Sequence, residues 1–115
     1  MNLDWIRRHC LSFPHATEQV QWGNDLLFKV AGKMFALTPL EPAELVLCFK
    51  CAPENFVELI ERPGIRPAPY LARNHWVALE SADALPVQEI KRLLRESYEL
   101  VVAKLPKKTQ AELRR

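Results

Sequence analysis

The sequence predicts an α+β fold, a two-layer sandwich in which helices pack on one face of an antiparallel β-sheet. Apolar residues recur at helical spacing near the start, in the middle and near the end of the 115-residue chain. Segments with alternating apolar residues are grouped between these helices and separated by turn-rich breaks, which is typical of an antiparallel meander. The expected order is α-β-β-β(β)-α-β(β)-α, in a single domain that covers residues 1–115.

The first expected element is a helix that begins after Asn2 and ends before Pro14. The Asn2 side chain can cap the helix, and Leu3, Ile6 and Cys10 fall on one side of it at helical spacing. Pro14 ends the helix because its ring cannot continue the hydrogen-bond ladder.

The next segment changes to a period of two and predicts strands. A short strand around residues 20–22 precedes a turn-rich break at residues 23–25. Strands at residues 26–30 and 33–38 are then joined by the two-residue turn Ala31-Gly32, since glycine accepts the positive φ that primed turns need.

This turn also predicts the register of the hairpin. It sets Phe28 opposite Phe35 and Leu26 opposite Leu37, so that apolar cross-strand pairs share one face of the sheet.

The middle of the chain predicts a third long strand and a second helix. The strand covers residues 45–50, and the helix starts at Pro53 and ends at Pro63-Gly64. Residues 66–70 hold two prolines, so they form a sheet edge or a stiff extended connector.

The last third of the chain predicts a further strand and the longest helix. The strand covers residues 75–80, and the helix runs from about Val87 to Lys104 and closes at Pro106. Residues 107–115 are expected to be a frayed basic tail.

The net charge of +2 hides an uneven distribution along the chain. The last fifteen residues hold five basic side chains and one acidic one, and the remainder holds eleven basic and thirteen acidic ones. The protein is therefore a slightly acidic body with a basic end, and a polyanion-coating role is excluded.

The three cysteines and the apolar pattern indicate the setting of the protein. An odd count of cysteines provides no disulfide framework, and no run approaches the roughly 20 apolar residues that span a bilayer. The start of the chain does not resemble a signal peptide. We therefore expect a cytoplasmic monomer without a membrane partner.

Cys48 and Cys51 have the CxxC spacing used by metals and by thiol exchange. Cys48 lies in a predicted strand, where residues three apart face opposite ways, and there is no second pair for zinc. We therefore interpret both as structural, although Cys51, just before the second helix, has some scope for reactivity. No metal and no cofactor are expected.

The other groups with chemical potential favour a structural interpretation as well. The histidines have no metalloprotease or facial-triad spacing, although His75 stands at a strand start beside Trp76. Ser97 lacks the context of a nucleophilic serine, and a small residue on a buried helix face more often permits close packing. The three glycines form no phosphate-binding loop.

Five ordered blocks of the sequence resemble the MmcQ/YjbR family of small bacterial proteins. The resemblance covers nearly the whole chain. The blocks are Gln21-Trp22-Gly23 with residues 28–36; Phe49-Lys-Cys51 with Pro53-Glu54; Pro67-Ala68 with Tyr70 and His75-Trp76; residues 97–101; and Lys104-Leu-Pro-Lys-Lys108.

This resemblance implies a two-layer fold described as a double-wing DNA-binding architecture, in a family whose function is largely uncharacterised, and it brings no catalytic residues. Carried over by position, Lys29 and Lys33 fall on the hairpin that forms a wing. The chain departs from the family at Ala52, where many members have a capping Asp, which weakens the second helix by about 1 kcal/mol. It also departs before His75, where Arg73 stands in for a lysine.

Three functions follow for comparison. The first is a DNA-binding domain that meets phosphates through Lys29, Lys33, Arg66, Arg73, His75, Lys104, Lys107 and Lys108. The second is a module that binds a protein or a small ligand through the aromatic surface of Trp22, Tyr70 and Trp76, and it requires an exposed apolar patch or a real pocket. The third is an enzyme built around His75. We do not expect this function, and we assign no catalytic residues.

Overall fold

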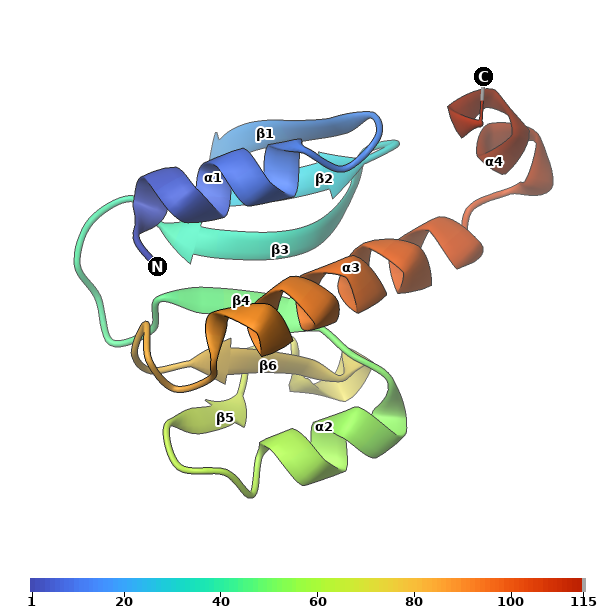
Figure 1. Ribbon diagram of the computed structural model, residues 1–115. Coiled ribbons are helices and arrows are strands. Elements are labelled where there is room, and N and C mark those ends of the chain that lie inside the picture. The colour runs from blue at the N-terminus through green and yellow to red at the C-terminus, as the bar shows by residue number, and fades with distance from the viewer. Residues whose placement is uncertain (115) are drawn as a thin grey trace.

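The computed structural model describes residues 1–114 as a six-stranded antiparallel sheet with α1 and α3 lying across one of its faces (Figure 1). The strand order across the sheet is β1-β2-β3-β4-β6-β5. The elements in chain order are α1 (Leu3–Leu11), β1 (Ala16–Gln21), β2 (Asp25–Val30), β3 (Lys33–Pro39), β4 (Leu47–Lys50), α2 (Pro53–Leu59), β5 (Ile65–Pro67), the short 3₁₀ helix η1 (Ala72–Asn74), β6 (Trp76–Leu79), α3 (Val87–Ala103) and α4 (Lys107–Leu113). This arrangement confirms the predicted α+β sandwich.

The helix starts follow from local chemistry, with one tertiary contribution. The Asn2 side chain accepts a hydrogen bond from the Trp5 amide at 2.9 Å and caps α1, as predicted. Ala52 provides no side-chain cap for α2. Instead, the Glu96 carboxylate on α3 accepts hydrogen bonds from the Ala52 amide and from the Asn55 side chain, so a residue distant in sequence supplies the missing acceptor.

The β2–β3 hairpin has the predicted turn but a different register. Val30 pairs with Lys33 around Ala31-Gly32, both of which have positive φ. A bulge then shifts the pairing by one residue, so that Phe28 pairs with Ala36 and Leu26 with Thr38. The predicted pairs Phe28–Phe35 and Leu26–Leu37 are therefore wrong. The extra residue is Phe35, which lets Phe35 and Ala36 both reach the core beneath the helices.

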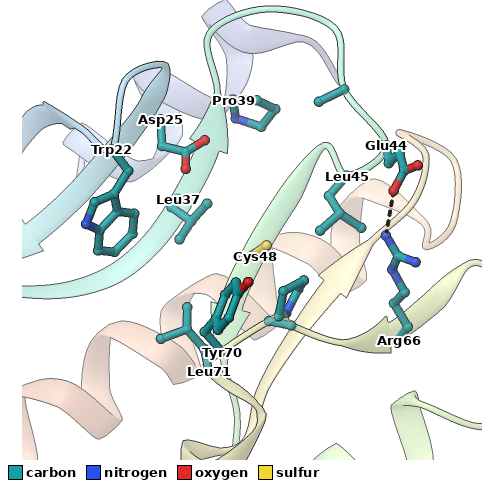
Figure 2. A pocket seen from close by; sticks show the side chains of 13 residues that line it. Trp22, Asp25, Leu37, Pro39, Glu44, Leu45, Cys48, Arg66, Tyr70 and Leu71 are labelled. Atoms are coloured by element: carbon teal, nitrogen blue, oxygen red, sulfur yellow. Dashed lines mark hydrogen bonds and ion pairs between the residues drawn. The ribbon is translucent and has the colours of Figure 1, made fainter.

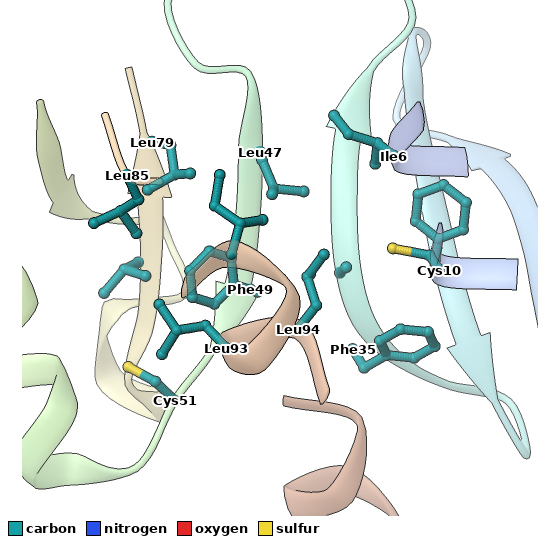
Figure 3. Close-up of a cluster of buried hydrophobic side chains, with 14 of the residues drawn as sticks. Ile6, Cys10, Phe35, Leu47, Phe49, Cys51, Leu79, Leu85, Leu93 and Leu94 are labelled. Atoms are coloured by element: carbon teal, nitrogen blue, oxygen red, sulfur yellow. The ribbon is translucent and has the colours of Figure 1, made fainter. Parts of the chain in front are cut away.

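Two apolar clusters lie on opposite faces of the sheet. The larger one fills the space between the sheet and the helices, with Phe35 and Phe49 from the strands and Leu93 and Leu94 from α3 at its centre (Figure 3). The smaller one lies on the other face, which we call the open face. Its buried members are Leu27, Leu37, Cys48, Ala68, Trp76 and Ala78.

Strands β3 and β4 are paired over a short length, which we call the seam. A buried hydroxyl group continues the hydrogen bonding at each end of it. Their register consists of two pairs among the described residues, Ala36–Phe49 and Leu37–Cys48. At one end of the seam, the Ser97 hydroxyl on α3 donates to the Phe35 carbonyl at 2.6 Å and accepts from the Lys50 amide at 3.0 Å.

At the other end of the seam, the buried Thr38 hydroxyl donates to the Val46 carbonyl at 2.8 Å. The two hydroxyls thus satisfy backbone groups where the strands separate.

The C-terminal segment differs from the expected frayed tail. Residues 107–113 form helix α4, which starts after Pro106. The Gln110 side chain donates to the Leu105 carbonyl at 2.8 Å, and Leu113 packs against the main core. Arg115, also part of the expected tail, lies outside the described residues.

Within residues 1–114, no helix has both the length and the apolar character needed to cross a membrane.

The seam predicts a large effect of a very small substitution. Ser97→Ala leaves the Phe35 carbonyl and the Lys50 amide buried without their partner, and we expect it to lower the free energy of unfolding by about 2–4 kcal/mol. Chemical denaturation followed by circular dichroism measures this. The control is Ser12→Ala, which removes an exposed hydroxyl that bonds the His9 carbonyl and should cost roughly 0.5 kcal/mol or less. A loss below about 1 kcal/mol for Ser97→Ala would contradict the role given to this hydroxyl.

Candidate functional site

The open face of the sheet carries a cleft of about 720 Å³ (Figure 2). This volume lies within the range of about 300–1,000 Å³ that is usual for sites of small ligands. The floor consists of Leu37 from β3 and Cys48 from β4, which form the open-face pair of the seam, together with Leu71. Pro39 and Leu45 line the cleft farther along the same face, so most of its surface is apolar.

Two large aromatic side chains at the rim of this cleft are unusually exposed. The Trp22 side chain, in the turn between β1 and β2, is 63% exposed, and Tyr70, between β5 and η1, is fully exposed. Both have a left-handed backbone, with φ of 53° at Trp22 and 64° at Tyr70. For a bulky residue this conformation is a real outlier and costs about 1–2 kcal/mol.

Three charged side chains line the cleft: Asp25, Glu44 and Arg66. They differ in whether a group of opposite charge lies beside them. The Arg66 guanidinium lies 3.3 Å from a Glu44 carboxylate oxygen and 3.8 Å from one of Glu80. Figure 2 shows the Arg66–Glu44 pair on one side of the cleft and Asp25 with Trp22 on the other. Among residues 1–114, the side-chain hydrogen bonds and ion pairs do not include the Asp25 carboxylate.

The cysteines are not suited to thiolate chemistry. Burial, with a smaller contribution from the nearby Asp25 carboxylate, raises the pKa of Cys48 to about 12. Burial also raises the pKa of Cys51 to about 12, so the reactivity allowed for this thiol from the sequence is not supported. Cys48 belongs to the open-face cluster and Cys51 to the main core, so the pair faces opposite ways as predicted.

In the described part of the chain, no group of three His, Cys, Asp or Glu side chains is placed to hold a metal ion.

The aromatic surface predicted from the sequence is brought together in part. Trp22 and Tyr70 both line the cleft. Trp76 is 4% exposed and belongs to the open-face cluster. Its burial follows from topology, because β6 is an interior strand between β4 and β5 and Ala68 and Leu71 pack in the same cluster.

The predicted nucleic-acid residues differ in their surroundings. Arg66 lines the cleft and is paired with two glutamates, so its charge is compensated. The Lys29 ammonium donates to the Gln19 side chain at 2.7 Å, while Lys33 is exposed at the hairpin tip. Arg73 is exposed on η1, and the half-buried His75 ring packs edge-on against Phe56.

A basic group that the sequence did not single out lies at the end of β4. The Lys50 ammonium donates to the Asn74 carbonyl at 3.2 Å. Burial and the neighbouring Lys104 ammonium lower the pKa of Lys50. Lys107 and Lys108 follow on α4, which comes after the C-terminal end of α3 (Figure 1).

The sequence did contain a signal for Lys50. Lys50 ends β4 and Lys33 begins β3, and because these two strands are antiparallel, both lysines lie at the same end of the sheet. The cleft residues Asp25, Leu45 and Cys48 had no comparable signal, because they converge through the pairing of β3 and β4 and the loops around it.

Comparison with known proteins places this fold in a family. A model of the YjbR family matches residues 11–100. The structure is similar to that of a Deinococcus radiodurans protein with a DUF419 domain, at a TM-score of 0.88 and 33% identity, covering 97% of this chain and 87% of that one. A protein from Pseudomonas syringae shares the fold at a TM-score of 0.70 and 23% identity, covering 87% of this chain and 98% of that one. A search of curated proteins found no match. The chain belongs to the YjbR family.

Proposed function

We propose that this protein is a binding protein whose open-face cleft takes a small apolar ligand, and that it is not an enzyme. The observation that carries the proposal is the pair of exposed aromatic rings, Trp22 and Tyr70, held at left-handed positions on the rim of an apolar cleft.

The energetics of the two rim residues support a ligand. Exposure of Trp22 and Tyr70 to water gives up the stabilisation that burial would provide, and their backbone conformation adds strain. Asn or Gly would occupy such turns with less strain. A ligand that covers part of one ring buries on the order of 50 Å² of apolar surface, which stabilises the complex by about 1–1.5 kcal/mol.

The chemistry of the cleft supports binding over catalysis. Its one thiol, Cys48, has a pKa raised to about 12 by burial and stays protonated at neutral pH. The Arg66 guanidinium donates a hydrogen bond to Glu44 and lies 3.8 Å from the Glu80 carboxylate. These groups are better suited to orienting a bound ligand than to acting as nucleophiles toward it.

The rim rings predict the behaviour of a neutral fluorescent probe. N-phenyl-1-naphthylamine should bind with one-to-one stoichiometry and increased fluorescence, and Trp22→Ala should weaken its affinity about tenfold because one wall of the site is lost. The matched control is Val57→Ala, which removes an exposed apolar side chain from α2, outside the cleft.

Unsaturable binding, or equal loss in both variants, would exclude a specific apolar site at this cleft.

A second candidate function is attachment to DNA phosphates, and the lysines near the end of β4 favour it. The Lys104 ammonium lies close enough to Lys50 to contribute to lowering the pKa of Lys50, and Lys107 and Lys108 follow on α4. A phosphate between them would relieve the repulsion. The remainder of the chain is slightly acidic, so the attraction is local and belongs to the hairpin and the C-terminal region.

This candidate predicts a salt-dependent affinity for duplex DNA. The double variant Lys50→Gln/Lys104→Gln should reduce the slope of log affinity against log salt by about two, since each phosphate contact contributes about 0.9. Lys91→Gln, on α3 near His9, is the control for loss of charge alone. Binding that is absent at low salt, or a slope that both variants change equally, would contradict the candidate.

A further inference from the structure

We propose that the ligand of the open-face cleft carries a positively charged ammonium group on an apolar body. The ammonium is held at the side of the cleft where Asp25 lies with the ring of Trp22, and Tyr70 is the second ring on the rim. This inference rests on the proposed function and names the class of ligand for the same site.

The charge balance of the cleft selects this class. Its lining contains two carboxylates, Asp25 and Glu44, and one guanidinium, Arg66. Arg66 is already ion-paired with Glu44 and with Glu80, the residue that follows β6. An anionic ligand would therefore compete with two glutamates for Arg66, whereas a cation meets a carboxylate that is unpaired among residues 1–114.

The position of Asp25 suits a partly desolvated ion pair. The residue is half-buried, and its backbone is paired with Gln21 in β1 and Pro39 in β3, so the carboxylate is attached to a rigid part of the sheet. It lies near enough to the buried Cys48 thiol to raise the pKa of that thiol. An ammonium at this position would thus be shielded in part from water, which strengthens its attraction to the carboxylate.

The aromatic rim adds a second attraction of the same sign. The faces of tryptophan and tyrosine rings carry negative potential and attract organic ammonium groups, and two rings with a carboxylate form a recurring means of recognising them. The apolar floor of Leu37, Cys48 and Leu71 then contacts the hydrocarbon body of the ligand.

Three probes of one shape and different charge test the inference: 4-phenylbutylammonium, 4-phenylbutanol and 4-phenylbutyrate. Binding is measured by ¹H–¹⁵N correlation spectra of the whole chain, with the indole signal of Trp22 as the reporter. The ammonium should bind about tenfold more tightly than the alcohol, and the carboxylate more weakly than the alcohol. Asp25→Asn should remove the advantage of the ammonium over the alcohol.

The control variant is Glu61→Gln, which removes an exposed carboxylate outside the cleft lining and should leave all three affinities unchanged. Equal affinities for the ammonium and the alcohol, or an advantage that persists in Asp25→Asn, would overturn the inference while the apolar site stands. Tightest binding of the carboxylate would overturn it in favour of recognition by Arg66. Absence of binding by all three probes would overturn the proposed function itself.

Discussion

The architecture depends on how β3 and β4 are joined at the middle of the sheet. Two register pairs connect them, and beyond these pairs the Ser97 and Thr38 hydroxyls bond backbone groups at either end. The carbonyl that Ser97 binds belongs to Phe35, the extra residue of the bulge in the β2–β3 pairing, where the ladder is locally disrupted. Ser97 also attaches α3 to the sheet, so one buried hydroxyl joins the two layers and the two strands.

Both candidate sites follow from this seam. On the open face, the seam pair Leu37–Cys48 forms the floor of the cleft, and the loop that joins β3 to β4 contributes Leu45. At the end of the sheet, the Ser97 hydroxyl accepts a hydrogen bond from the Lys50 amide, and Lys104, seven residues farther on, is the C-cap residue of α3. Since residues seven apart share one side of a helix, the same face of α3 that joins the seam also carries the second lysine toward Lys50.

Local patterns predicted the fold class, the order of the elements and the hairpin turn, because each depends on a few neighbouring residues. The register beyond the bulge was not predictable, since it depends on the packing of Phe35 beneath α3 rather than on the turn. The substitute cap at Ala52 depends on Glu96, which is distant in sequence. The site was predictable only in part for the same reason. Trp22 and Tyr70 could be selected from the sequence as amphipathic rings. The burial of Trp76 and the position of Asp25 in the cleft depend on the order of the strands in the sheet.

On the proposed function, the two rim rings are maintained for binding and not for folding. Tyr70→Asn tests it most directly when the free energy of unfolding and the affinity for N-phenyl-1-naphthylamine are measured on the same variant. Asn tolerates the left-handed backbone better than Tyr, and the fully exposed ring makes little contribution to the core. We therefore expect stability to be unchanged or raised by about 0.5–1 kcal/mol and affinity to fall several-fold. A variant that is clearly less stable and binds the probe as well as before would contradict the claim.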